Sequence, residues 1–293
     1  MSTNHKISIR FFDDREVRAV WDDANSKWWF SVLDIVAVLR DQDDYNKNRN
    51  YWKYLKAKLK KENSELGSAT TQLKLSAMDG KRYLTDMLDY EGVKALGKEF
   101  PSKKANRFID WFTYSDESID GKSKTKAYAL FETSFIDSIE VGTTKGLQQI
   151  HAYLFGGLYD FAGQLRNKSI AKGGFRFTPA HYLETHLEKI EAMPEINLDA
   201  IVAKYTAMNI AHPFMEGNGR STRIWLDLML KKQIKCCVDW SKISKDSYMN
   251  AMIISTVDSS ELLKIIKNAL TTEIHSREMF MKGIDYSYYY EEN

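Results

Sequence analysis

The chain has 293 residues, of which 43% are hydrophobic and 13% aromatic, and its formal net charge is +2. This composition excludes a disordered chain, and the longest apolar runs are too short to cross a bilayer, so no membrane partner is expected. A length of roughly two ordinary domains predicts two domains, each able to bury a core. The first residues lack the apolar run of a secretory signal, and Cys236 and Cys237 are adjacent, which favours the cytoplasm.

The N-terminal half begins with a predicted small sheet. Residues 6–12 and 16–22 alternate between apolar and polar side chains as strands do. Residues 28–39 (WWFSVLDIVAVL) pass from a strand into an apolar helix after a polar turn. Residues 1–115 are therefore predicted to form an α+β domain.

A basic segment follows at residues 46–61 (NKNRNYWKYLKAKLKK). It has seven lysines and arginines and no acid, with aromatic and aliphatic side chains between them. One interpretation is a solvated helix face. The other is a surface for the phosphate backbone of nucleic acid, because basic side chains release counterions when they bind it.

Two stretches of this half, residues 11–39 and residues 104–112 (KANRFIDWF), carry a resemblance to a known domain. They resemble the Bro-N domain of phage antirepressor-like and baculovirus proteins. The resemblance covers residues 6–115, contains no catalytic signature and implies DNA binding.

A polar stretch separates the two halves of the chain. Residues 114–127 contain Ile119 as their one aliphatic side chain and a single glycine, a composition typical of linkers. We therefore predict a linker at residues 116–126 and a second domain at residues 127–293.

The second half contains a predicted hairpin and a predicted helix. Residues 169–177 (SIAKGGFRF) are predicted to form the hairpin, because Gly173 and Gly174 suit a tight turn. An ordinary structural hairpin is one interpretation of this segment. Residues 198–210 have apolar side chains at spacings of three and four, which predicts an amphipathic helix.

Residues 212–223 (HPFMEGNGRSTR) join the end of that helix to the start of another. Pro213 breaks helical hydrogen bonding. Gly217 and Gly219 permit a concave turn around Asn218, in which backbone N–H groups converge. The next helix points its N-terminus at whatever fills this turn, so the segment predicts an anion-binding site.

The side chains around this turn are suited to the transfer of a group from a nucleotide. His212 has an ordinary pKa of about 6.5 and can take a proton from an attacking hydroxyl. Glu216 is a hard oxygen ligand for Mg²⁺. Arg220 and Arg223 share one helix face and can reach the same oligophosphate.

The same residues resemble the Fic family, whose signature reads HxFx(D/E)GNGRxxR. The sequence from His212 to Arg223 fills every specified position, and the resemblance covers about residues 126–293. It implies a mostly α-helical domain with a β-hairpin flap, and transfer of AMP from ATP to a hydroxyl of a target protein. The related Doc kinases depart in the glycine turn and transfer phosphate, so the intact GNGR favours AMP transfer.

The resemblance also implies roles for individual residues. His212 would deprotonate a Ser, Thr or Tyr hydroxyl, and Glu216 would hold Mg²⁺. The implied nucleotide-binding residues are Phe214, Gly217, Asn218, Gly219, Arg220 and Arg223, with Asn218 on the α-phosphate. The implied flap contains Lys172, Gly173, Gly174 and Phe175, and could add a target segment as an extra strand.

The C-terminal segment suggests regulation of this site. We expect Gly283 to end one helix and Asp285 to cap a short new one at about residues 285–293. Ser287 and Glu291 then lie on one face. A frayed terminus with its aromatic side chains packed on the core is the simpler alternative.

Fic proteins with a C-terminal inhibitory helix carry the pattern (S/T)xxxE(G/N). Ser287 and Glu291 match it, whereas Glu292 departs from it. The resemblance implies that Glu291 pairs with Arg223 and occupies the arginine that a γ-phosphate needs. The tyrosines beside this carboxylate are candidates for modification by the protein itself: Tyr286, Tyr288, Tyr289 and Tyr290.

Three functions remain open from the sequence. The first is an adenylyltransferase for a protein target, which the N-terminal domain recruits to DNA. The second is a DNA-binding regulator whose Fic half senses nucleotide, although a sensor needs no base such as His212. The third is a de-adenylylase in which Glu291 activates water. Control of the inhibitory helix by contacts in a homo-oligomer is also open.

Overall fold

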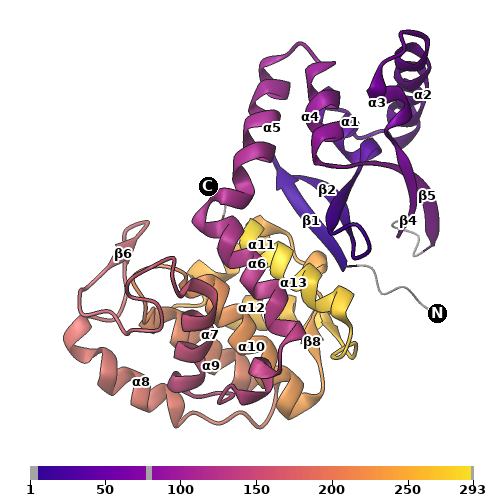
Figure 1. Cartoon of the computed structure of the whole chain (residues 1–293). Coiled ribbons are helices and arrows are strands. Elements are labelled where there is room, and N and C mark those ends of the chain that lie inside the picture. Colours follow the sequence, from indigo (N-terminus) through magenta and orange to yellow (C-terminus); the bar gives the residue numbers. More distant parts are fainter. Residues whose placement is uncertain (1–5, 77–80, 292–293) are drawn as a thin grey trace. The chain divides into compact units, whose positions relative to one another are not determined.

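The computed structural model of the chain describes residues 6–76 and 81–291. The chain divides into two compact units, Met1–Ser118 and Ile119–Asn293 (Figure 1). Within the described ranges, no helix is long and apolar enough to cross a membrane.

The first unit is built on a five-stranded antiparallel sheet. Its strands are β1 (Lys6–Phe12), β2 (Arg15–Asp22), β3 (Lys27–Ser31), β4 (Thr71–Ser76) and β5 (Arg82–Leu88), in the spatial order β1-β2-β3-β5-β4. A two-residue turn at Asp13 and Asp14 joins β1 to β2, and both residues have positive φ, as hairpin turns of this length require. The strands predicted at the start of the chain are present.

Five helices complete this unit: α1 (Val32–Arg40), α2 (Tyr45–Lys61), α3 (Glu65–Ser68), α4 (Tyr90–Lys98) and α5 (Lys103–Tyr114). The side chain of Ser31 caps α1 by accepting a hydrogen bond from the N–H of Asp34. Buried side chains of the strands and helices, among them Phe30, Trp52 and Phe108, form the larger core, and Val20, Leu75 and Met87 form a separate small cluster. An α+β unit is therefore present, as predicted.

The linker predicted at residues 116–126 is wrong over most of its length. Helix α6 (Ile119–Glu132) begins directly after Ser118, the last residue of the first unit. Ser123, Ala127 and Leu130 are its buried side chains, and they lie at spacings of four and three. Their small number leaves the helix with a polar composition, which concealed its buried stripe.

The second unit is mostly helical. Besides α6 it contains α7 (Thr144–Phe155), α8 (Leu183–Glu191), α9 (Leu198–Ala211), α10 (Asn218–Ile234), α11 (Lys245–Ile254), α12 (Ser260–Asn268) and α13 (Arg277–Tyr289). Helix α10 packs against α7, α9 and α13. Its side chain Trp225 is fully buried and donates a hydrogen bond to the carbonyl of Thr143.

Two short two-stranded antiparallel sheets lie among these helices. They are β6 (Ala171–Lys172) with β7 (Phe175–Arg176), and β8 (Cys237–Val238) with β9 (Leu270–Thr271). Cys237 is buried, and burial raises the pKa of its thiol to about 12. A thiol that stays protonated is a packing residue rather than a nucleophile.

The C-terminal helix differs from the prediction. Helix α13 is continuous and is capped by the side chain of Ser276, which accepts from the N–H of Met279. Gly283 lies inside the helix against the ring of Trp240, so its small size serves close packing rather than helix termination. Asp285 is not a cap either, because it is buried and forms an ion pair with Lys124 of α6 at 2.8 Å.

Candidate active site

Helix α9 delivers His212 to the site. The side chain of Asn197 caps the start of α9 by accepting from the N–H of Ala200 at 2.9 Å. At its other end His212 adopts a left-handed backbone conformation, with φ 48°, and donates its N–H to the carbonyl of Met208. Helix α9 therefore ends where the proline in the motif predicts.

The motif turn has the backbone of an anion-binding site. Gly217, with φ 77°, is the residue before α10, and this positive φ favours glycine. The first in-helix hydrogen bond runs from the N–H of Ser221 to the carbonyl of Gly217. The N–H groups of residues 218–220 come before that bond and so have no carbonyl partner within α10. N–H groups in this position at a helix start attract anions.

The side chains of Asn218 and Phe214, which were predicted to bind the nucleotide, instead make contacts within the protein. Asn218 is buried, and its amide both accepts from the N–H of Phe214 and donates to the carbonyl of Phe214. Phe214 is fully buried and stacks on His151 at 3.8 Å between ring centroids. Their side chains are therefore engaged within the protein and leave ligand contacts to the backbone and the arginines.

His151 is a buried site residue that the sequence analysis missed. Its Nδ1 accepts from the N–H of Gly163 at 2.8 Å, so its Nε2 carries the proton and donates to the carbonyl of Glu216 at 2.9 Å. Burial lowers the pKa of His151 to about 4. This neutral ring braces the motif turn from α7.

Arg166 is a second site residue that the sequence analysis missed. Its guanidinium donates to four backbone carbonyls, those of Lys168, Thr178, Ala211 and His212. It is only 4% exposed. Because one rigid fork joins the end of α9 to the chain on both sides of the β6–β7 hairpin, Arg166 fixes the backbone at His212.

His212 has the geometry of a general base. Its Nδ1 lies 3.3 Å from the carbonyl oxygen of Asn209, so Nδ1 carries a proton and the lone pair is on Nε2. Burial lowers the pKa of His212 to about 4, which keeps the ring neutral at ordinary pH. The ring stacks on Phe177 at 3.7 Å between centroids, and this contact fixes its plane.

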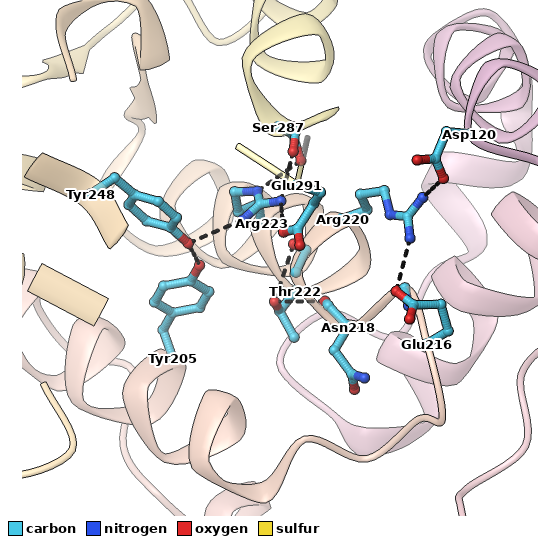
Figure 2. A network of polar contacts seen from close by, with 12 residues as sticks. Asp120, Tyr205, Glu216, Asn218, Arg220, Thr222, Arg223, Tyr248, Ser287 and Glu291 are labelled. Atoms are coloured by element: carbon cyan, nitrogen blue, oxygen red, sulfur yellow. Dashed lines mark hydrogen bonds and ion pairs between the residues drawn. The ribbon is translucent and has the colours of Figure 1, made fainter. Parts of the chain in front are cut away.

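Arg220 lies between the carboxylates of Asp120 and Glu216 (Figure 2), and two aromatic rings also pack on it. It donates to Asp120 of α6, and to Glu216 at 3.1 Å. Its guanidinium lies over the rings of Phe155 and Tyr288, at 5.0 and 5.5 Å from their centroids. Asp120 was missed because it lies in the segment predicted to be a linker.

Arg223 is held by the C-terminal segment. Its Nε donates to the hydroxyl of Ser287 at 2.8 Å, and one terminal nitrogen donates to Glu291 at 2.5 Å (Figure 2). The predicted pairing of Glu291 with Arg223 is therefore present. Burial raises the pKa of Glu291, but the charge of Arg223 and its hydrogen bond outweigh burial, so the pKa is lowered overall.

The carboxylate of Glu291 also lies against the motif turn. A Cβ atom added to Gly219 would overlap its Oε1 atom. Glycine is therefore needed here for close approach, while the same carboxylate contacts Arg223. A negative group from the chain itself occupies the start of α10.

The hairpin β6–β7 is formed by a two-residue turn at Gly173 and Gly174, with φ of 57° and 82°. Lys172 pairs with Phe175 across it, and all four residues are exposed. The ring of Phe175 contacts Phe177 edge-on, and Phe177 in turn stacks on His212.

Electrostatics also connect the hairpin with the site. Besides burial, the positive charge of Lys172 lowers the pKa of His212. Together with the stronger effect of Arg223, it lowers the pKa of Glu291 as well. The hairpin therefore lies near His212 and near the carboxylate of Glu291.

The tyrosines predicted as modification sites are mostly inaccessible. Tyr286, Tyr288 and Tyr290 are buried, and only Tyr289 is partly exposed. Tyr288 donates to the hydroxyl of Ser123 at 2.9 Å, and Tyr290 donates to two backbone carbonyls before α11. In this conformation the burial of these three side chains disfavours self-modification, and the hydroxyls of Tyr288 and Tyr290 are also engaged within the protein.

Glu216 can hold a metal ion in this arrangement. Its side chain is 58% exposed, although one oxygen contacts Arg220 and the N–H of Gly217. The described residues contain no group of three metal-binding side chains. Mg²⁺ bound with a nucleotide needs only one or two carboxylates, because phosphates and water supply the other ligands, so Glu216 fits it.

Comparison with known proteins agrees with this geometry. Residues 142–230 match the Fic/DOC family. The Fic region is similar to the protein adenylyltransferase VbhT of Bartonella schoenbuchensis, with 30% identity over 177 residues, 52% of this chain and 36% of VbhT. It is also similar to a probable protein adenylyltransferase Fic of Salmonella typhimurium, with 27% identity over 46% of this chain and 74% of the relative.

The chain thus spans about a third of VbhT and about three quarters of the Salmonella relative. Among solved structures, BepC of Bartonella tribocorum with bound AMPPNP is 17% identical, with a TM-score of 0.44 over 53% of this chain and 85% of BepC. A Fic domain from Bartonella quintana with bound ADP is 18% identical, with a TM-score of 0.44 over 53% of this chain and 84% of that structure. These scores are below 0.5, so the similarity to the Fic/DOC family is carried by the sequence matches alone.

Proposed function

We propose that the chain is a protein adenylyltransferase, which transfers AMP from ATP to a hydroxyl side chain of a target protein. One observation carries the proposal: His212 keeps a neutral ring with its lone pair on Nε2, beside a helix start flanked by Arg220 and Arg223. The similarity to protein adenylyltransferases over the Fic region supports it.

The proposed reaction proceeds by removal of a proton, attack on the α-phosphorus and departure of pyrophosphate. Nε2 of His212 takes the proton of the target hydroxyl, and the oxygen then attacks the α-phosphorus. A new O–P bond forms, the bond between the α- and β-phosphates breaks, and pyrophosphate leaves. The N–H groups at the start of α10 stabilise the charge that develops on the phosphate oxygens.

Glu216 would hold Mg²⁺ and Arg220 and Arg223 would bind the phosphates. When bound, Mg²⁺ neutralises phosphate charge in the transition state. Glu216 would have to exchange its contact with Arg220 for the metal, and Asp120 would then remain as the partner of that arginine. The hairpin with Lys172 and Phe175 would dock the target segment as an added strand.

Glu291 keeps this enzyme inactive in the conformation described here. Its carboxylate occupies Arg223 and the space beside Gly219, so the γ-phosphate of ATP and the carboxylate compete for one arginine. Hydrolytic removal of AMP, the third function left open, would need Glu291 as the base for water, and here that carboxylate is paired with Arg223.

The test uses ATP labelled on either the α- or the γ-phosphate. With Mg²⁺ and a protein extract, Glu291→Gly should attach the α-label to protein many times faster than the native chain. The γ-label should not be attached, because pyrophosphate leaves. Glu273→Gln, an exposed carboxylate before α13, is the matched control and should behave like the native chain.

Further variants decide between enzyme and sensor. Adding His212→Ala to Glu291→Gly should abolish labelling while nucleotide binding persists. Attachment of the γ-label would instead identify a kinase, and absence of any label in Glu291→Gly would contradict the proposal.

DNA binding by the first unit is a second, separate function that one observation favours. On α2 the cations Lys47, Arg49, Lys53, Lys58, Lys60 and Lys61 are exposed, whereas Lys56 is engaged with Asp86 at 2.7 Å. The aromatic side chain of Tyr54 is 67% exposed on the same helix. A basic helix with exposed aromatics suits the phosphate backbone, and the Bro-N resemblance stays a prediction.

A further inference from the structure

The polar contacts of Arg223 have two origins. Three come from the C-terminal segment: Nε donates to the hydroxyl of Ser287, and one terminal nitrogen donates to the carbonyl of Ser287 at 2.7 Å and to Glu291 at 2.5 Å. The fourth comes from α11, where the other terminal nitrogen lies 3.3 Å from the hydroxyl of Tyr248 (Figure 2). Among the described residues, Tyr248 is the one polar partner that does not belong to the C-terminal segment.

Tyr248 has supports outside that segment, in addition to the ring of Tyr290, on which it stacks at 4.8 Å between centroids. Its hydroxyl lies 2.5 Å from the hydroxyl of Tyr205, a fully buried side chain of α9. Because arginine only donates, the oxygen of Tyr248 accepts from Arg223 and leaves its own proton for Tyr205. Its ring also packs edge-on against Trp240, at 5.4 Å between centroids.

Removal of the C-terminal carboxylate leaves Arg223 in a difficult environment. The side chain is 3% exposed, and a buried cation that loses its counter-charge tends to turn away or to admit water, even though the two contacts with Ser287 remain. The ring of Tyr248, 5.5 Å from the guanidinium carbon, and its hydroxyl would remain. With that edge held, the other edge still points at the space that Glu291 occupies.

We propose that Tyr248 is a positioning residue, which holds Arg223 ready for the γ-phosphate of ATP once Glu291 gives way. Tyr205 supports it from α9, the helix that ends at His212, so the base and the arginine are oriented from one element. This inference rests on the proposed function. It assigns Tyr248 to the released state, in which preorganisation of the arginine strengthens ATP binding.

The test measures the binding of ATP and of ADP, each with Mg²⁺, by calorimetry. The parent is the double variant His212→Ala, Glu291→Gly, which neither turns over nor carries the competing carboxylate. Adding Tyr248→Phe should weaken ATP binding roughly tenfold, the effect of losing one hydrogen bond to a charged group. ADP binding should change less than about twofold, because ADP lacks the phosphate that Arg223 would bind.

Tyr290→Phe is the matched control. Its ring lies 5.6 Å from the guanidinium carbon of Arg223, much as that of Tyr248 does, but its hydroxyl donates to backbone carbonyls. In the parent it should leave the ratio of ATP to ADP affinity unchanged. With Glu291 intact, Tyr248→Phe should also leave that ratio unchanged, because Glu291 then holds Arg223 and keeps it from the γ-phosphate.

The outcomes separate this inference from the proposed function. Equal loss of ATP and ADP binding, or no loss, in Tyr248→Phe would overturn the positioning role alone. A parent that binds neither nucleotide would overturn the proposed function and this inference with it. Tyr205→Phe keeps the contact of Arg223 with Tyr248 and should give a smaller loss that is again selective for ATP, which a general folding defect would not produce.

Discussion

Two buried imidazoles at the site share a lowered pKa but differ in their hydrogen-bond partners. Burial lowers the pKa of His151 and of His212 to about 4, so both rings are neutral near pH 7. Both nitrogens of His151 have backbone partners, whereas in the described residues His212 is bonded through Nδ1 only. His151 therefore has a structural role, whereas Nε2 of His212 retains a lone pair that can accept a proton.

The lowered pKa of His151 predicts a loss of stability in mild acid. Between pH 6.5 and 4 the unfolded chain binds a proton that the folded protein excludes, so the stability present above pH 6.5 falls as the pH falls. The slope for one histidine is about 1.4 kcal/mol per pH unit. Urea unfolding of His212→Ala between pH 7.5 and 5 should show this slope.

His151→Gln in the same background provides the comparison. It should be less stable at pH 7.5, because glutamine cannot reproduce both hydrogen bonds, but its stability should vary less with pH. The same slope in both proteins would show that another group is responsible.

The sequence predicted the paired polar side chains of the site better than the side chains that hold its backbone in place. Arg223, Ser287 and Glu291 were found because short motifs name both partners. Arg166 and His151 were not found, because their partners are backbone groups, which every residue has. A side chain that binds a carbonyl leaves no complementary residue in the sequence.

At the scale of single elements, the β6–β7 hairpin should affect the protein substrate and not the nucleotide. Replacing Lys172 and Phe175 by alanine in Glu291→Gly removes two exposed side chains beside His212. Target labelling should fall at least several-fold while ATP affinity, measured by calorimetry, persists. Lys168→Ala, an exposed lysine just before the hairpin, should change neither.

Helix α2 should contribute to DNA binding through charge. Each phosphate contact adds about 0.9 to the slope of log affinity against log salt, so Lys53→Ala with Lys60→Ala should reduce that slope by roughly two. Fluorescence anisotropy with a short labelled duplex measures it. Lys98→Ala, an exposed lysine of α4, is the control. A salt slope that does not change would leave α2 as a solvated face.

The elements were predictable where periodicity was strong and obscure where composition dominated. The hairpin turn and the helix that Asn197 caps followed from local rules. Helix α6 did not, because its buried stripe consists of few residues, and α13 was divided wrongly at Gly283. Glycine marks helix ends in isolation, but close contact with Trp240 gives it another purpose here.

At the scale of the whole chain, α6 decides where the second unit can be cut. A fragment of residues 119–293 keeps Asp120, Ser123 and Lys124, which contact Arg220, Tyr288 and Asp285. A fragment that starts at residue 127, the predicted boundary, loses all three contacts. We expect the first fragment to unfold cooperatively and the second to melt roughly 5 °C lower or more.

The same two fragments should differ in activity. Without the first two turns of α6, helix α13 is held less firmly, so Glu291 should leave Arg223 more often and labelling from ATP should rise. Calorimetric melting and α-label transfer, measured on both fragments, check the two effects. Equal melting temperatures would show that α6 contributes little to this unit.

Under the proposed function, the ion pair between Arg223 and Glu291 would affect both the stability of the folded protein and its rate of AMP transfer. Arg223 is buried, and the carboxylate of Glu291 is the counter-charge that makes its burial tolerable. Loss of one partner of a buried pair costs about 3–5 kcal/mol, because the other is left uncompensated. Under the proposed function, a change that removes Glu291 would therefore raise activity and lower the stability of the nucleotide-free protein, and bound ATP would restore part of that stability.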